Sequence, residues 1–379
     1  MTEGNRSAVL ISCTNHYRER MYVMEEYLQR KGYRTVYITS DFDHNSKKNY
    51  RCDVPGCVQL PTKPYRRNLS VTRILSHRKF ARDVYAWLEQ LEQKPDLIVS
   101  EIPPNFLCHY LAKYKRKHPD CKLIFDIFDL WPETFPSGRM KKLLLPVFSV
   151  WAWIRDHSLP VADFVVCECE MFREKLGLAA EKSAAIYLTA NAISKDLQTP
   201  QLREDALDIC YLGAINNIID IPRICDLLSE LSAQRPVTLH IIGKGERQQK
   251  FVDQAKAAGA SVEFYGAVYD PQRKLEIMNR CHFGLNIMKP SVCVGLTMKS
   301  VDYFRFGLPL INSIPADTER LVRQENIGIQ LGADCGEKLL SLSLDQMLQM
   351  RQNVKKVFDS IFERKTIDAR YAQIFDGLL

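Results

Sequence analysis

The residues with the clearest chemical potential are Lys299 and Asp302, which follow a loop that contains Gly295. Thr297 is typical of a helix N-cap, so Lys299 is expected in the first turn of a helix. A cation there opposes the helix dipole unless an anion binds at the same place, held by free amide groups and by the ammonium. The Asp302 carboxylate, three residues further on, could accept hydrogen bonds from vicinal hydroxyls. This spacing would suit a nucleotide, with its phosphate on Lys299 and its ribose on Asp302.

A structural role for the same residues is the alternative. Lys299, Asp302 and Arg305 also have the spacing of a polar face on an amphipathic helix. Spacing alone does not separate the two interpretations, and both stay open at this point.

Two glycine-containing turns add a second candidate element. The sequence YLGAINN, residues 211–217, ends a predicted strand at Gly213, and GKGE, residues 243–246, repeats the pattern with Lys244 as an extra charge. Glycine lets backbone amides approach a diphosphate closely, although an ordinary tight turn is the alternative for each sequence. Neither turn has the G-x-G-x-x-G spacing and no acidic residue follows at the dinucleotide distance, which argues against a nicotinamide-dependent enzyme.

A third candidate is the acidic segment DIFDLWPETFP, residues 126–136, at the predicted end of an apolar strand. Asp126, Asp129 and Glu133 could orient sugar hydroxyls or move a proton if they face a cleft. The alternative is a proline-terminated loop whose acids lie in solvent or cap a helix.

The segment MKKLLLPVFSVWAWIRDH, residues 140–157, is the fourth candidate. Together with Arg139 it combines basic residues, Lys141 and Lys142 among them, with leucines and two tryptophans. This composition suits a helix that lies on an anionic membrane, and a buried helix at a domain interface is the alternative. Its apolar run, residues 143–154, is too short for a membrane-spanning helix, which needs about 20 residues.

Length and composition limit the class of protein. The chain has 379 residues, enough for two to three domains, and its 46% hydrophobic and 26% charged residues are typical of a folded protein. The net charge of +7 is compatible with a phosphate-bearing ligand or an anionic membrane and is too small to indicate nucleic acid. The twelve scattered cysteines lack zinc-site spacing, and no secretory signal is visible. We therefore expect free thiols, no metal and a reducing compartment.

Apolar strands that alternate with helices predict two α/β domains, each with a doubly wound parallel sheet. Strands are predicted at residues 8–12, 35–40, 96–100, 122–128, 163–168, 184–189, 208–213, 238–243, 262–266, 283–288, 308–313 and 327–331. The polar stretch 194–205 is the predicted linker. The predicted domains are therefore residues 1–193 and 206–355, followed by a C-terminal helical segment, 356–379. Ligands of such sheets bind at the carboxyl ends of the strands.

The sequence resembles a retaining glycosyltransferase of family 4, with the GT-B fold of two Rossmann-like domains. The resemblance covers nearly the whole chain and is strongest in VGLTMKSVDYFRFGLPLI, residues 294–311. This stretch is similar to a Gly-Leu-Pro-x-Lys-x-x-Glu-Tyr pattern, and DLWPE, residues 129–133, resembles a segment of bacterial capsular and exopolysaccharide enzymes. The resemblance implies that the second domain binds a nucleotide diphosphate sugar and the first binds the acceptor. It also implies transfer in the cleft between them and a last helix that crosses back to the first domain.

The sequence departs from the family pattern at several positions. Val294 stands where the first of two glutamates is usual, and Asp302 stands where the second is. Thr297 replaces a proline, Phe128 replaces a histidine, and Asn216, Asn217 and Asp220 occupy the region where relatives place an arginine and a lysine. Lys299 is thus left as the main candidate cation for the phosphates. The predicted catalytic residues are Lys299 and Asp129. The predicted donor-binding residues are Gly213, Asn216, Gly243, Lys244, Gly266, Gly295, Leu296, Thr297, Met298, Lys299 and Asp302.

These observations lead to a main hypothesis and two alternatives. The main one is a metal-independent glycosyltransferase that moves a sugar with retention from a nucleotide diphosphate sugar to a saccharide or lipid-linked saccharide, in cell-surface polysaccharide biosynthesis. We expect it in the cytoplasm, with no cofactor, no nucleic-acid partner and a peripheral membrane contact through residues 139–155. The alternatives are a non-catalytic homologue that acts as partner or chaperone of an active transferase, and a nucleotide-sugar epimerase.

Overall fold

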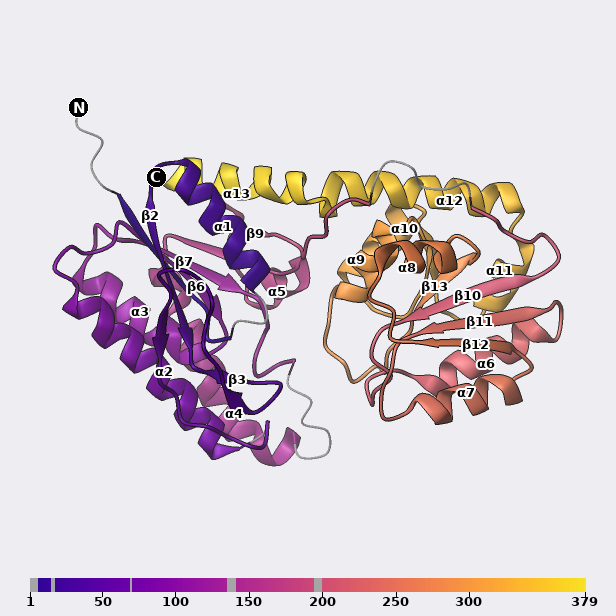
Figure 1. Ribbon diagram of the computed structural model, residues 1–379, viewed down its shortest axis with the longest axis horizontal. Coiled ribbons are helices and arrows are strands. Elements are labelled where there is room, and N and C mark those ends of the chain that lie inside the picture. The colour runs from indigo at the N-terminus through magenta and orange to yellow at the C-terminus, as the bar shows by residue number, and fades with distance from the viewer. Residues whose placement is uncertain (1–5, 15–17, 69, 135–140, 194–199) are drawn as a thin grey trace. The chain divides into compact units, whose positions relative to one another are not determined.

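The structure, a computed structural model, describes residues 6–14, 18–68, 70–134, 141–193 and 200–379 (Figure 1). The side chains of residues 18, 19 and 141–144 are not among those described. The chain divides into two compact units. The first consists of residues 1–187 with 368–379, and the second of residues 188–367.

The first unit is built on a seven-stranded sheet in which every neighbouring pair is parallel, in the order β5-β2-β1-β6-β7-β8-β9. The strands are β1 (Ser7–Ile11), β2 (Arg34–Ser40), β5 (Val58–Leu60), β6 (Leu97–Ile102), β7 (Lys122–Ile127), β8 (Phe164–Cys167) and β9 (Ser183–Ala185). A short antiparallel pair, β3 (Phe42–Asp43) and β4 (Lys48–Asn49), follows β2. Every residue of β1 and β6 is buried, as expected for strands covered on both faces.

Helices cover both faces of this sheet. In Figure 1, α2 (Val71–Gln90), α3 (Asn105–Lys117) and α4 (Lys141–Asp156) lie on one face, and α1 (Arg18–Arg30) and α13 (Arg364–Leu378) lie on the other. The short helix α5 (Glu170–Lys175) follows β8. The end of α13 packs on α1, because the rings of Tyr27 and Phe375 stack 5.2 Å apart and the Tyr27 hydroxyl donates to Asp376 at 2.6 Å.

The second unit has a six-stranded parallel sheet in the order β12-β11-β10-β13-β14-β15. Its elements are β10 (Leu207–Leu212), α6 (Ile221–Ser232), β11 (Val237–Ile242), α7 (Gln248–Ala257), β12 (Ser261–Gly266), α8 (Pro271–Met278), β13 (Phe283–Asn286), α9 (Met298–Arg305), β14 (Leu310–Asn312), α10 (Asp317–Gln324), β15 (Gly328–Gln330), α11 (Cys335–Ser341) and α12 (Leu344–Val357). Numbered in chain order, these strands run 3-2-1-4-5-6, the Rossmann order.

In both sheets the strand order reverses beside the first strand, and ligands of such sheets bind at this point. In each, the chain leaves the first strand towards one edge and returns on the other side, so that β1 lies beside β6 and β10 beside β13. The turns at the carboxyl ends of such a pair diverge and leave a crevice, where open α/β sheets bind their ligands. Each unit therefore has one predicted crevice.

The predicted alternation of strands and helices is confirmed, with two differences. The strand predicted at 184–189 ends at Ala185, and the short strands β3 to β5 and helix α11 had no recognisable pattern in the sequence. The C-terminal segment is two helices, α12 and α13, joined by a π-helical turn over Phe358–Phe362.

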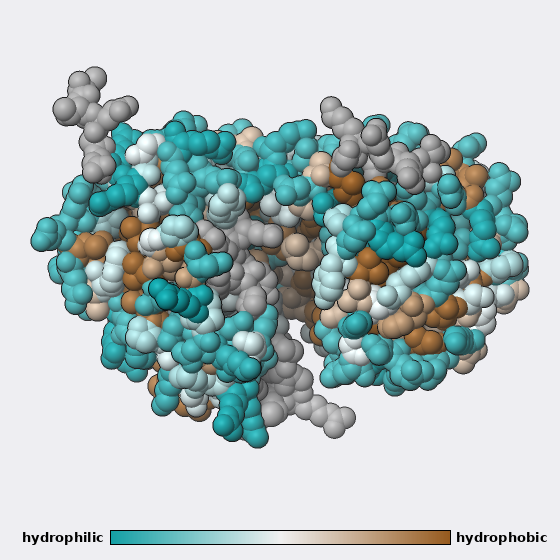
Figure 2. Space-filling model, in the orientation of Figure 1, coloured by the Kyte–Doolittle hydropathy of each residue, from teal (hydrophilic) through white to brown (hydrophobic). Residues whose placement is uncertain are grey.

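No helix of the described residues is both long enough and apolar enough to span a membrane. On the face drawn in Figure 2, hydrophilic residues predominate over both units, and apolar residues appear in small separate groups.

Candidate functional site

Three glycine turns lie side by side at the carboxyl ends of β10, β11 and β12. Gly213, Gly243 and Gly266 have φ angles of 121°, 152° and 68°, which side chains other than glycine rarely adopt. The turns are tightly packed, because the Gly213 amide donates to Ile242 at 2.9 Å and the Gly243 amide to the Gly266 carbonyl at 2.7 Å. A Cβ atom on Gly243 would lie 1.9 Å from the Gly213 carbonyl oxygen. Glycine at these positions thus allows neighbouring turns to pack closely against each other.

Lys299 reaches these turns from the first turn of α9. The Thr297 hydroxyl accepts a hydrogen bond from the Ser300 amide at 3.1 Å, so the predicted N-cap is confirmed. The Lys299 side chain runs past Gly213, and its ammonium lies 4.8 Å from the centre of the Tyr211 ring. Among the described residues this ammonium has no hydrogen bond and no ion pair. Burial lowers the pKa of Lys299 to about 8. A half-buried cation at a helix N-terminus, without a counter-ion, is suited to an anionic ligand.

A cavity of about 640 Å³ brings most of the predicted donor-binding residues together. Those that line it are Gly213, Asn216, Gly243, Lys244, Thr297, Met298, Lys299 and Asp302. Gly266, Gly295 and Leu296 do not line it. Gly266 supports the turn at Gly243, and the Gly295 carbonyl accepts hydrogen bonds from the amide and the hydroxyl of Thr318, at 2.9 and 2.7 Å.

Asp302 lies in the same cavity, as the helical spacing from Lys299 predicts. Burial raises the pKa of its carboxyl group above the usual value, and the positive charges of Lys274 and Arg305 partly offset this effect. No hydrogen bond or ion pair with another described residue engages the carboxyl group. It is therefore available to accept hydrogen bonds from a ligand.

Sequence reasoning missed other residues of this cavity, among them Val268, Tyr269 and Lys274. The side chain of Tyr269 is 86% exposed at its rim. All three follow the carboxyl end of β12, and the rule that ligands bind at strand ends could have pointed to them.

A buried amide network holds the N-terminus of α9. The Asn286 side chain, at the end of β13, donates to the Ser300 hydroxyl at 3.0 Å and to the Asn312 side-chain oxygen at 2.8 Å. The Asn312 amide in turn donates to Gln330 at 2.7 Å. Because these polar groups are satisfied by one another, they fix the first turn of α9 against three strand ends.

Tyr303 anchors the other side of α9. Its buried hydroxyl accepts a hydrogen bond from the Leu212 amide at 2.6 Å and lies 3.2 Å from the carbonyls of Cys210 and Leu285. A Cβ atom on Gly284 would lie 2.6 Å from the tyrosine ring, so this glycine makes room for it. Lys299 thus projects from a helix that is fastened to β10 and β13.

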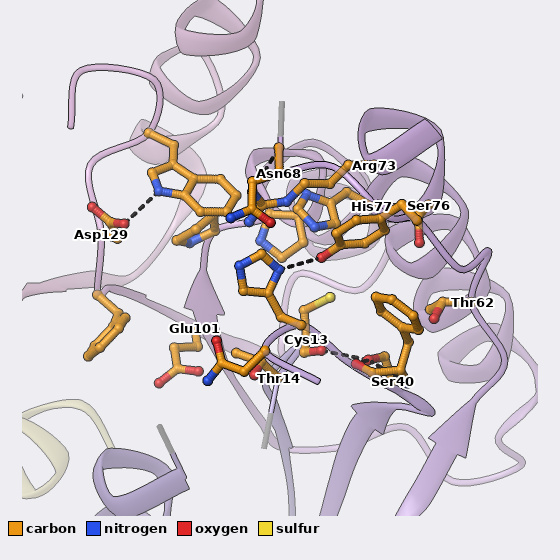
Figure 3. Close-up of a pocket in the computed structure, with 18 of the residues that line it drawn as sticks. Cys13, Thr14, Ser40, Thr62, Asn68, Arg73, Ser76, His77, Glu101 and Asp129 are labelled. Atoms are coloured by element: carbon orange, nitrogen blue, oxygen red, sulfur yellow. Dashed lines mark hydrogen bonds between the residues drawn. The ribbon is translucent and has the colours of Figure 1, made fainter. Parts of the chain in front are cut away.

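The first unit has its own cavity, of about 320 Å³, at the crevice between β1 and β6 (Figure 3). Asp129, the second predicted catalytic residue, lines it. Its carboxylate accepts hydrogen bonds from the Trp131 indole and the Thr134 hydroxyl, both at 2.5 Å. Burial raises the pKa of Asp129 above the usual value. Phe128 lines the cavity as well. Polar side chains that no sequence motif marks also line it, among them Arg73, His77 and Glu101.

The other two acids of segment 126–136 do not reach this cavity. Asp126 is fully buried inside β7 and forms two hydrogen bonds with the Arg20 guanidinium, at 2.6 and 2.9 Å. The prediction that Asp126 could act on a ligand is therefore wrong. Glu133 forms a two-pronged ion pair with Arg155, at 2.7 and 2.9 Å. Both acids serve the fold as partners of buried arginines.

Helix α4 contains most of the predicted membrane segment. Leu145, Val147, Val150 and Trp153 are exposed on it, whereas Trp151 is buried. Arg155 is only 1% exposed and paired with Glu133, so it is not a membrane-facing cation. Arg139 and Met140 lie outside the described residues, and the side chains of Lys141 and Lys142 are not described.

In the described part of the chain, no three His, Cys, Asp or Glu side chains converge in a way that could hold a metal ion. Cys108, Cys121, Cys167, Cys210, Cys281 and Cys335 are buried free thiols.

Comparisons with known proteins identify the fold of the chain. Neither the family models nor the curated proteins compared with the chain match it. Among solved structures, it is similar to the lipopolysaccharide outer core galactosyltransferase WaaB, with a TM-score of 0.68 at 13% identity over 98% of this chain and 100% of that one. It is also similar to HepE of Anabaena in complex with UDP-glucose, at a TM-score of 0.62, 13% identity and the same shares of each chain. A third is WaaG, a glycosyltransferase involved in lipopolysaccharide biosynthesis, at a TM-score of 0.60, 13% identity and the same coverage.

These likenesses confirm the predicted fold class. The chain has the GT-B fold, with two Rossmann-like units on parallel sheets followed by C-terminal helices. Assignment to family 4 and to its capsular subgroup stays a prediction, as do the roles of Lys299, Asp129 and the donor-binding residues.

Proposed function

We propose that the protein is a retaining glycosyltransferase that moves a sugar from a nucleotide diphosphate sugar to a saccharide or lipid-linked saccharide in cell-surface polysaccharide biosynthesis. The observation that carries this proposal is the Lys299 ammonium, half-buried beside three glycine turns and without a counter-ion among the described residues. The fold is shared with WaaB, a galactosyltransferase, and with HepE, whose complex contains UDP-glucose. Both support a nucleotide sugar as the donor.

The chemistry follows from where charge develops. When the bond between the sugar C1 and the diphosphate oxygen breaks, its electron pair goes to the diphosphate. The Lys299 ammonium and the free amides at the start of α9 stabilise that added charge. Asp302 accepts hydrogen bonds from the ribose hydroxyls. The acceptor hydroxyl then attacks C1 from the face that the diphosphate leaves and gives its proton to the departing diphosphate oxygen, which retains the configuration without an enzyme nucleophile. We assign Asp129 to the acceptor hydroxyl, since it lines the cavity of the first unit.

A panel of nucleotide sugars tests this function. We expect one of them to raise the melting temperature, because a ligand at 100 times its dissociation constant stabilises a protein by about 2.7 kcal/mol. The same donor, incubated with saccharide acceptors, should give a product whose anomeric proton signal in NMR shows the donor configuration. Stabilisation without transfer to any acceptor would indicate the non-catalytic alternative. Deuterium from solvent in the recovered donor would indicate an epimerase.

A peripheral membrane contact through residues 139–155 is part of the proposal. The exposed apolar side chains of α4 are accompanied by Val71 and Leu75 of α2, which are 71% and 46% exposed. Between these helices lies an apolar groove, lined by Ile74, Phe106, Pro146, Val147, Val150, Trp151 and Ile154. An apolar surface of this kind suits a bilayer, and the basic residues 139, 141 and 142 precede it in the sequence.

Sedimentation with lipid vesicles tests this contact. The protein should sediment with vesicles that contain phosphatidylglycerol more than with pure phosphatidylcholine. The double variant Val150→Ser/Trp153→Ser should lose at least about tenfold in partitioning, since each exposed apolar side chain contributes about 1 kcal/mol or more on burial. Tyr22→Ser, a change of an exposed aromatic residue on α1, is the matched control. Equal partitioning of the double variant and this control would contradict the proposal.

A further inference from the structure

The cavity of the first unit is lined mainly by aromatic rings and by uncharged polar side chains. Its rings include those of Tyr65, Phe128 and Trp131, and its hydroxyl and amide groups include those of Thr62 and Asn68. Its volume of about 320 Å³ lies at the small end of the range for ligand pockets. Apolar rings beside hydrogen-bonding groups match a ligand with apolar C–H faces and a rim of hydroxyls, such as a single sugar residue.

Two buried side chains of this cavity have polar atoms without a hydrogen-bond partner among the described residues. These atoms are Oε1 of Glu101 and Nδ1 of His77, and the two residues are 3% and 6% exposed. The other carboxyl oxygen of Glu101 accepts a hydrogen bond from the Ser12 hydroxyl. In Figure 3, His77 of α2 and Glu101 of β6 lie on different sides of the cavity. Buried polar groups are nearly always hydrogen-bonded in native proteins, so these atoms indicate a ligand that forms hydrogen bonds on both sides.

Glu101 and His77 are both uncharged near neutral pH. Burial raises the pKa of Glu101 to about 8, so its carboxyl group carries a proton there. Burial, helped by the charges of Arg73 and His44, lowers the pKa of His77 well below its usual value, so the imidazole stays neutral. A sugar hydroxyl can donate one hydrogen bond and accept others, so it can pair with a protonated carboxyl group and with a neutral imidazole alike.

The charged side chains of this cavity are matched within the protein. Among the described residues that line it, Arg73 is the only Lys or Arg, and Asp129 is its charge partner. The Arg73 guanidinium donates to the Asn68 carbonyl at 3.0 Å and lies 4.2 Å from the centre of the Trp131 ring. The Asp129 carboxylate accepts hydrogen bonds from Trp131 and Thr134. A further charge on the ligand would therefore be buried without a partner, which is unfavourable.

We propose that this cavity binds one uncharged sugar residue of the acceptor, whose hydroxyls form hydrogen bonds with Glu101 and His77, and that it disfavours sugars with a carboxylate. The proposal rests on the function given above, in which the first unit binds the acceptor. It adds the class of sugar and the two residues that hold it. Asp129 lines the same cavity, so a ring held by Glu101 and His77 shares this space with the carboxylate assigned to the acceptor hydroxyl.

Matched pairs of methyl glycosides test the proposal with the full chain. The methyl glycosides of glucose, galactose and mannose are compared with those of the corresponding uronic acids, which have a carboxylate in place of the hydroxymethyl group. In NMR titrations we expect at least one neutral glycoside to bind, and its uronic acid counterpart to bind at least about tenfold more weakly. If none of the neutral glycosides binds, or if the uronic acid of a pair binds as tightly as the neutral sugar, the proposal is wrong.

Variants identify the residues responsible. His77→Phe keeps a ring and removes the nitrogens, and Glu101→Leu removes the carboxyl group, so each should weaken binding of the neutral glycoside about three- to tenfold. Glu101→Gln should keep most of the affinity, because an amide can still donate and accept. This rescue by the conservative variant separates a contact with the sugar from a role in packing. His109→Phe, the same change at an exposed position on α3, is the matched control. Unchanged affinity in both His77→Phe and Glu101→Leu would overturn the assignment.

UDP binding, measured separately by calorimetry, keeps this proposal apart from the proposed function. If UDP binds and acidic saccharides serve as acceptors as well as neutral ones, the proposal for the cavity fails and the transferase function stands. If no nucleotide binds, the proposed function fails, whereas the glycoside titrations still decide what the cavity holds.

Discussion

Replacing Lys299 by methionine is expected to weaken UDP binding roughly 30- to 1,000-fold, which corresponds to about 2–4 kcal/mol. The lost interaction is a charge-assisted contact between the ammonium and the diphosphate in a half-buried place, where water replaces it poorly. Methionine keeps the unbranched apolar stem that passes Gly213 and lies on the Tyr211 ring, so α9 should stay in position.

Calorimetric titration with UDP measures this effect. Lys250→Met, a change of an exposed lysine on α7, is the matched control and should bind UDP like the unmodified protein. Retained affinity in the Lys299 variant would remove Lys299 from the nucleotide site and with it the main support for the proposed function.

The pH dependence of the same titration gives a second, independent test of Lys299. Because its pKa is lowered to about 8, the free protein loses this charge above pH 8, whereas a bound diphosphate favours the ammonium. The affinity of the unmodified protein should therefore be constant between about pH 7 and 7.5 and fall up to about tenfold per pH unit above pH 8, with uptake of a proton on binding. The methionine variant should lack both the fall and the proton uptake.

The elements around Lys299 were predictable because their signals are local. The Thr297 hydroxyl accepts a hydrogen bond from the amide of Ser300, only three residues away. Each glycine turn lies at the end of its own strand. The spacing that placed Lys299 and Asp302 on one side of a helix needed only the helical period. Local sequence was thus enough to place Lys299 and Asp302 together in the cavity of the second unit.

The supports of the site were not predictable, because they join distant parts of the chain. Asn286 contacts Ser300 and Asn312, which lie 14 and 26 residues away, and Asp126 contacts Arg20 over 106 residues. No spacing rule pairs such residues, and buried asparagines and aspartates look the same in sequence as exposed ones. For this reason the sequence does not distinguish Asp126, which has a structural partner, from an acid that binds a ligand.

Apart from Asp129, the polar residues of the cavity in the first unit were not predicted, for a related reason. Arg73 and His77 belong to α2, whose amphipathic pattern shows a helix face but not that this face borders the end of β6. Glu101 lies inside β6, one residue before its end, and its burial, which raises its pKa to about 8, depends on elements on both sides of the sheet.

The second large effect is expected at Arg20, where Arg20→Met should lower the free energy of unfolding of the first unit by about 3–5 kcal/mol. Arg20 and Asp126 are 4% and 0% exposed, and the guanidinium also donates to the Ile186 carbonyl at 2.7 Å. Without the arginine, the Asp126 carboxylate stays buried near the acids Glu101 and Glu168 and has lost its main partner. The same pair holds α1, β7 and the chain beyond β9 together.

Urea unfolding followed by tryptophan fluorescence measures this loss, because every tryptophan lies in the first unit. The double variant Arg20→Met/Asp126→Asn should recover a large part of the stability, since the penalty belongs to the uncompensated charge rather than to the missing arginine. Arg30→Met, an exposed change on α1, should alter the stability by less than about 0.5 kcal/mol. A double variant no more stable than Arg20→Met would show that Arg20 acts through its packing and its carbonyl contact instead. UDP binding should persist in all three variants, because the proposed nucleotide site is built only from residues of the second unit.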